Sequence, residues 1–193
     1  MGFKVSAVLA RCEADVLVDA LDMSVRGIEE EMPDDCIWCA KLLSTGWSVV
    51  YANDFEFAER VRDRAMRLSG RVPVFDMSLH EGVMFSQVRR YGEDATRWRV
   101  EWEVEHGPVA SNPSVSGKPP ASLAASPQRA ADARGADAEV DHYFEVSLEA
   151  LSEETGFRHD VLLRETDVDA FRILEKKPGQ VAGFFSRPIG AKG

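Results

Sequence analysis

The spacing of apolar residues changes within the first 35 residues. From Phe3 to Leu9, apolar residues alternate with smaller or polar ones, which is the period of a strand with one buried face. From about Ala14, apolar residues recur every three or four positions, which predicts a helix that runs to about Arg26 and is ended by Gly27. The segment from Glu29 to Asp35 is too charged for a buried element, so we expect a loop or an exposed edge there.

The densest apolar run of the chain lies between Asp34 and Asp54 and includes two tryptophans and two cysteines. In one interpretation, a strand from Cys36 to Ser44 turns into a second strand from Trp47 to Asn53, and the two form a core hairpin. In the other interpretation, Cys36 to Leu43 is a helix. The choice decides whether the two cysteines can meet, because residues three apart point to opposite faces of a strand but share one face of a helix.

The middle of the chain contains the clearest helix and hairpin. An apolar stripe predicts a helix from Phe55 to Leu68, with Gly70 as its stop. A strand is expected at 71–77, and Val83 to Tyr91 and Arg97 to Glu105 are expected to form an antiparallel hairpin. In the second arm of this hairpin, charged residues alternate with residues that we expect to be buried, namely Trp98, Val100, Trp102 and Val104.

The last third of the chain begins with a change of composition. Residues 107–138 are rich in Ala, Ser, Pro and Gly and hold almost no large apolar residue, so we expect a long mobile loop. After it, Tyr143 to Val146 indicate a strand, and Leu148 to Thr155 indicate a helix that stops at Gly156. Short apolar segments then complete the core, and the tail from Lys177 is expected to dock.

These elements predict a single domain, residues 1–193, of the α+β class. We expect a mainly antiparallel sheet with helices packed on one face. The chain has 193 residues, of which 45% are apolar, and this is enough for one well-filled core. The alternative is a thioredoxin-like α/β arrangement, which depends on the helical interpretation of Cys36 to Leu43.

Cys36-Ile37-Trp38-Cys39 is the motif with the most direct chemical interpretation. Two thiols at this spacing at a helix N-terminus can cycle between dithiol and disulfide. If a helix begins at Cys36, the strand, helix and Val72-Pro73-Val74 that follow resemble the thioredoxin fold over about 40 residues. The resemblance implies a thiol oxidoreductase with Cys36 as nucleophile and Cys39 as resolving thiol. In the strand interpretation, both cysteines are structural and form no disulfide.

Charge is unevenly distributed along the chain. The formal net charge is −10, which disfavours binding to a nucleic-acid backbone. The segment from Glu13 to Asp35 holds nine acids against Arg26 alone. One interpretation is a solvated acidic face with ion pairs to the arginines of 60–99. The other is an acidic surface that contacts a basic protein partner through Glu29, Glu30, Glu31, Asp34 and Asp35.

The cysteine count bears on the cellular compartment. Three cysteines, an odd number, and no recognisable signal peptide favour a reducing, cytoplasmic location. No stretch approaches the roughly 20 apolar residues that span a bilayer. Arginine and alanine greatly outnumber lysine, which is typical of a GC-rich bacterial genome.

The remaining motifs are short. His80-Glu81 and Arg158-His159-Asp160 each place an acid beside a histidine, but neither extends to a longer catalytic signature. Two cysteines with His80 or His159 could supply zinc ligands, but no second paired-ligand motif exists, so we expect neither metal nor cofactor. Ser116-Gly117-Lys118 is similar to the end of a phosphate loop, but the earlier glycine that such a loop requires is replaced by Asn112.

From charge and from the missing catalytic motifs, we expect a non-catalytic, cytoplasmic binding or regulatory protein. Its acidic surface would contact a basic protein partner in the manner of a bacterial immunity protein. The alternative is the thiol oxidoreductase that uses the Cys36 and Cys39 pair.

Overall fold

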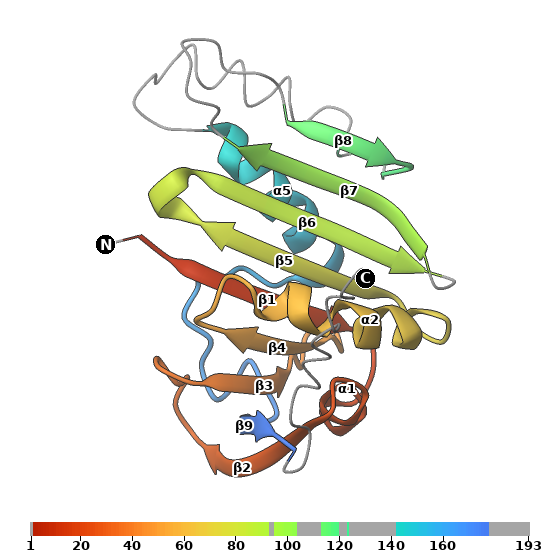
Figure 1. Cartoon of the computed structure of the whole chain (residues 1–193). Coiled ribbons are helices and arrows are strands. Elements are labelled where there is room, and N and C mark those ends of the chain that lie inside the picture. Colours follow the sequence, from red (N-terminus) through yellow and green to blue (C-terminus); the bar gives the residue numbers. More distant parts are fainter. Residues whose placement is uncertain (1, 93–94, 104–112, 120–122, 124–141, 178–193) are drawn as a thin grey trace, which may run out of the picture.

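The computed structural model describes residues 2–92, 95–103, 113–119, 123 and 142–177. In this part of the chain, nine strands form one sheet and every neighbouring pair is antiparallel. The spatial order is β2-β9-β3-β4-β1-β5-β6-β7-β8 (Figure 1). The strands are β1 (Lys4–Ala10), β2 (Met23–Glu29), β3 (Ile37–Lys41), β4 (Ser48–Ala52), β5 (Val74–His80), β6 (Phe85–Gly92), β7 (Ala95–Glu103), β8 (Ser114–Gly117) and β9 (Phe171–Lys176).

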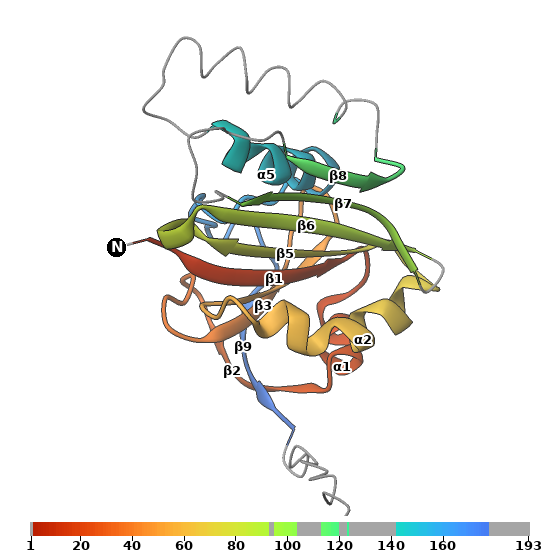
Figure 2. The ribbon, with the colours of Figure 1, turned by 45° about the horizontal axis from the view of Figure 1, so that its top comes forward.

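Helices lie on both faces of the sheet. The α-helices α1 (Ala14–Ala20) and α2 (Phe57–Ser69) cover one face, and α5 (His142–Thr155) covers the other (Figure 2). A short 3₁₀ turn, η1 (Glu81–Val83), joins β5 to β6. The α+β class and the mainly antiparallel sheet are confirmed, but the expectation that the helices share one face is corrected by α5.

Two separate hydrophobic clusters follow from this layering. Along β1, Val5, Ala7 and Leu9 belong to the cluster beneath α5, while Val8 and Ala10 belong to the cluster beneath α1 and α2. Both sets are buried because β1 lies in the middle of the sheet and is covered on both sides. The strand predicted from the alternation at Phe3 to Leu9 is therefore present, but it buries two faces instead of one.

The first helix is shorter than its hydrophobic period predicts. The prediction of a helix to Arg26, ended by Gly27, is wrong: α1 ends at Ala20, and Asp22 takes a left-handed conformation with φ 57°. The chain then enters β2, which contains Gly27 beside a register shift in its pairing with β9. That pairing joins residues about 150 positions apart, so the local period could not show it.

The C-terminal helix also differs from the prediction. Tyr143 to Val146 form the first turns of α5 and not a strand. The helical stripe is Phe144, Leu148, Leu151 and Thr155, all of which are buried. Gly156, with φ 75°, ends the helix as predicted.

Within 107–138, the structure describes 113–119 and Leu123. Ser114–Gly117 form β8, which pairs with β7, so this part of the expected mobile loop is a strand. Its side chains are all exposed, so backbone pairing with β7 holds this strand and burial of apolar residues does not. Leu123 is buried in the cluster beneath α5. The other residues of the expected loop, and the tail beyond Lys177, lie outside the described residues.

Trp38 on β3 joins three strands of the core. Its ring stacks on Tyr51 of β4 at 5.2 Å between centroids and meets Phe171 of β9 edge-on at 5.5 Å. We expect Trp38→Ala to lower the free energy of unfolding by about 3–5 kcal/mol, because it leaves a cavity among these rings. Urea unfolding measures the change. Leu43→Ala, at a side chain that is 58% exposed, is the control and is expected to change stability by less than about 0.5 kcal/mol.

Candidate functional site

The acidic segment predicted as a docking surface lies at an edge of the sheet. β2 is the outermost strand on this side, and a loop leads from its end to β3. Pro33 is buried and Met32 packs against the cluster beneath α5, so apolar residues anchor the loop between its charged positions. We call the five exposed carboxylates the acidic edge; they are Glu29, Glu30, Glu31, Asp34 and Asp35.

The acids that precede the acidic edge are compensated by ion pairs. They pair as Glu13 with Lys41, Asp15 with Arg172 at 3.2 Å, Asp19 with Lys177 at 3.1 Å and Asp22 with Arg64 at 2.8 Å. By contrast, the five carboxylates of the acidic edge form no ion pair with any residue that the structure describes. The ion-paired interpretation therefore holds for the N-terminal half of the acidic segment, and only Asp22 uses an arginine of 60–99.

Apolar side chains are exposed beside the acidic edge. A hollow of about 800 Å³ is lined by Asp34, Asp35, Phe3 and Leu162, among others. A second hollow of about 370 Å³ brings Glu29 and Glu30 together with Ile28 and Glu165. Ile28 and Leu162 are 69% and 70% exposed, the two highest values among the large hydrophobic residues that the structure describes. Charged and apolar side chains thus line the same two hollows.

The two cysteines of the Cys-x-x-Cys motif lie on opposite faces of the sheet. Cys36 directly precedes β3 and packs against the cluster beneath α5, whereas Cys39 lies within β3 in the cluster beneath α1 and α2. The helical interpretation of Cys36 to Leu43, and with it the thioredoxin-like arrangement, is therefore wrong. All three cysteines are free thiols.

The environment of both thiols disfavours the thiolate. Burial raises the pKa of Cys39, and burial together with Glu29 and Asp35 raises the pKa of Cys36. A redox nucleophile needs the opposite shift, since the thiolate is the reactive form.

The histidine motifs do not converge on a common site. His159 meets Phe3 edge-on at 5.6 Å, and burial lowers its pKa. Its neighbour Asp160 is engaged by Arg158, with 2.9 Å between Nε and Oδ1. His80 packs edge-on against Phe55 at 5.6 Å. The described residues contain no cluster of three or more histidine, cysteine or carboxylate side chains that could hold a metal ion.

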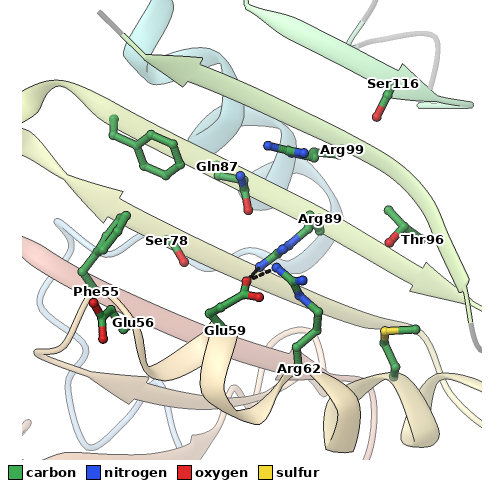
Figure 3. A pocket seen from close by; sticks show the side chains of 12 residues that line it. Phe55, Glu56, Glu59, Arg62, Ser78, Gln87, Arg89, Thr96, Arg99 and Ser116 are labelled. Carbon is green, nitrogen blue, oxygen red and sulfur yellow. Dashed lines mark hydrogen bonds and ion pairs between the residues drawn. The ribbon is translucent and has the colours of Figure 1, made fainter. Parts of the chain in front are cut away.

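A polar pocket of about 640 Å³ lies elsewhere, between α2 and the strands β5 to β8 (Figure 3). We call it the arginine pocket, because guanidinium groups from three elements line it: Arg62 of α2, Arg89 of β6 and Arg99 of β7. Sequence reasoning did not identify this site. The alternation along the hairpin indicated a wet face, but only the strand register and the position of α2 bring the three arginines together.

The register of the sheet creates an unusual like-charge pair in this pocket. Arg89 and Arg99 are direct cross-strand partners on β6 and β7. Like charges placed directly opposite each other destabilise a sheet, so nearby carboxylates must compensate them. Arg99 pairs with Glu101, which also accepts a hydrogen bond from Gln87.

Arg89 is compensated from two sides. Its Nε donates to Asp76 Oδ1 at 2.8 Å, and its Nη2 lies 3.1 Å from Glu59 Oε2. The side chains of Arg89 and Asp76 are 8% and 1% exposed, so this is a buried ion pair. Burial raises the pKa of Asp76 to about 7, and a hydrogen bond from Tyr91 to its other oxygen opposes that shift.

Comparison with known proteins gives this chain no relative, because no family model, curated protein or solved structure matches it. In the part of the chain that the structure describes, no helix is both long and apolar enough to cross a membrane. The geometry of the acidic edge and of the arginine pocket is therefore the basis for the functional argument.

The buried ion pair leads to a prediction about stability. We expect Asp76→Ala to lower the free energy of unfolding by about 3–5 kcal/mol, because Arg89 keeps its charge in a buried position without its closest partner. The double variant Asp76→Leu/Arg89→Met removes both charges and is expected to be less destabilised than Asp76→Ala. Urea unfolding of both variants measures this difference. A double variant less stable than the single one would contradict it.

The thiols lead to a second prediction. Iodoacetamide at neutral pH is expected to label Cys36 more slowly than a free cysteine, because its pKa is raised, and to label Cys39 only after unfolding. Mass spectrometry of digested protein reports both. A Cys36–Cys39 disulfide formed by mild oxidation of the native protein would contradict the placement of the two thiols on opposite faces.

Proposed function

We propose that the protein is a non-catalytic binding or regulatory protein of the bacterial cytoplasm, and that its acidic edge contacts a basic protein partner, in the manner of an immunity protein. The observation that supports this most directly is the contrast in pairing. Acids from Glu13 to Asp22 are neutralised within the chain, whereas those from Glu29 to Asp35 have no ion pair among the described residues.

Uncompensated charge of one sign destabilises the free protein and stabilises its complex with an oppositely charged partner. Like charges gathered at the end of β2 and on the loop after it repel one another, and an oppositely charged surface relieves that repulsion. Such a patch also speeds encounter, because long-range attraction steers the partner toward it. The acidic edge therefore favours a basic protein, and we propose no nucleic-acid partner.

The apolar residues beside the acidic edge supply the second part of an interface. Ile28 and Leu162 expose most of their side chains, and Phe3 and Val161 are about half exposed. Exposed apolar side chains rimmed by charged ones are typical of protein interaction sites. Charge would then set the rate of association and its dependence on salt, and the apolar residues would slow dissociation.

The thiol oxidoreductase is not favoured by any feature of the site. The two cysteines lie on opposite faces of the sheet, and the pKa of each is raised. Binding through the acidic edge is the function that the geometry supports best.

A matched pair of variants tests this function. The triple variant Glu30→Gln/Glu31→Gln/Asp34→Asn removes three charges from the acidic edge. The control, Asp63→Asn/Glu154→Gln/Glu175→Gln, removes three exposed charges elsewhere on the molecule. Partners are captured from a lysate of the native host at low and moderate salt and identified by mass spectrometry.

We expect wild-type protein and the control to capture the same basic protein, and the triple variant to capture at least about tenfold less of it. Association measured with the purified partner should weaken as salt rises. Capture of no basic protein at either salt concentration would contradict the proposal, as would equal capture by the triple variant and the control.

A further inference from the structure

The arginine pocket holds more hydrogen-bond donors than the described residues of the protein satisfy. A guanidinium carries five N–H donors, and the Nε atoms of Arg62 and Arg99 are buried without a hydrogen-bond partner among the described residues. A buried donor without an acceptor destabilises the fold by about 1–3 kcal/mol. Arg62 and Arg99 line the pocket, so a rotation of each guanidinium would bring these donors to oxygen acceptors on a ligand.

One protein carboxylate shows where an anionic oxygen is held. Glu59 Oε2 accepts from both Arg62 and Arg89, so a single oxygen lies between guanidinium groups of α2 and β6 (Figure 3). Glu59 itself is 54% exposed and comes from the surface of α2. It can therefore turn toward solvent and leave its place to a ligand oxygen.

The three arginines suit a phosphate group better than a flat carboxylate. They come from α2, β6 and β7, so they approach the pocket from different elements. A terminal phosphate presents three oxygens that point in different directions, and guanidinium groups bind such oxygens in bidentate geometry.

The other end of the pocket is aromatic. Phe55 and Phe85 line it, and their rings meet edge-on at 5.3 Å. Phe85, Gln87 and Arg89 alternate along β6 on one face, and four residues of strand place Phe85 about 13 Å from Arg89. Ser78 and Gln87 lie between the two ends, where they can form hydrogen bonds with a ligand (Figure 3).

We propose that the arginine pocket binds a nucleoside phosphate. The phosphate displaces Glu59 and is held by Arg62, Arg89 and Arg99, while the base packs against Phe55 and Phe85. The volume of about 640 Å³ is within the range of small-molecule sites. This inference does not rest on the acidic edge, which lies at the end of β2 and on the loop to β3.

Calorimetric titration of the whole protein tests the proposal. The probes are AMP, GMP, CMP and UMP, with inorganic phosphate and the four nucleosides as fragments. We expect at least one nucleotide to bind with a Kd below about 1 mM, and at least tenfold more tightly than phosphate or its own nucleoside.

Four substitutions locate the binding site. Arg62→Gln and Arg99→Gln are each expected to weaken binding of that nucleotide by about tenfold or more. Glu59→Gln is expected to strengthen it, because the competing carboxylate is lost. Arg64→Gln, on the same helix but paired with Asp22 outside the pocket, is the control and should leave binding unchanged.

The outcomes separate clearly. The proposal is overturned if no nucleotide saturates below about 1 mM, if phosphate alone binds as tightly as the nucleotides, or if Arg62→Gln and Arg99→Gln bind as wild type does. The side chains of Arg62 and Arg99 are 33% and 42% exposed, so both variants are expected to fold, which thermal unfolding verifies. The triple variant of the acidic edge should bind nucleotide normally, so failure of one proposal leaves the other intact.

Discussion

A single sheet has two faces to cover, and the helices of this protein cover them unequally. α5 lies over β6 and β7 on one face. On the other face, α1 lies over β2, β3 and β4, and α2 lies over β1, β5 and β6. An antiparallel sheet can leave part of a face in water if the residues there are polar. The polar floor of the arginine pocket follows from this incomplete cover.

The buried ion pair stands where the dry part of this face meets the wet part. One cross-strand row runs from β1 to β8 through Val8, Asp76, Arg89, Arg99 and Ser116. Val8 is fully buried and Ser116 is exposed, so the row passes from core to solvent within four strand spacings. Asp76 allows the first arginine of the row to be buried, and Tyr91 gives the same carboxylate a second donor. Without Asp76, the buried guanidinium of Arg89 would keep only Glu59 as an ion-pair partner among the described residues.

The sequence predicted those elements whose signal is local. The helix α2 has its own apolar stripe, and the hairpin of β6 and β7 is marked by alternation on both sides of a short turn. The elements that were missed depend on distant partners. β2 is a strand because β9 pairs with it, and Tyr143 to Val146 are helical because α5 packs on β6 and β7. A short apolar run has no local property that decides between helix and strand in such cases.

The same distinction applies to the candidate sites. The acidic edge was predicted because its residues are consecutive or nearly so, and charge can be counted along a chain. The arginine pocket was missed because Arg62, Arg89 and Arg99 become neighbours only through the strand register and the docking of α2. Arg89 and Arg99 even belong to a segment with balanced charge, so composition gave no sign of a local excess of guanidinium groups.

A strongly acidic protein with an arginine-lined pocket is not a contradiction, because the two groups of charges lie on different elements of the fold. From Glu29 at the end of β2 to β6 there are six strand spacings, which is roughly 30 Å. The loop after β2 comes nearer, because the backbone oxygen of Asp34 accepts a hydrogen bond from Asn53, two residues before Phe55. At physiological salt, interactions between exposed charges are largely screened beyond about 8 Å. The net charge of −10 therefore governs how large partners approach, whereas the guanidinium groups of the pocket act on a small anion at contact distance. It follows that charge couples Glu29 to the guanidinium groups only weakly, and that a direct connection between the two sites runs from Asp34 through Asn53 to Phe55.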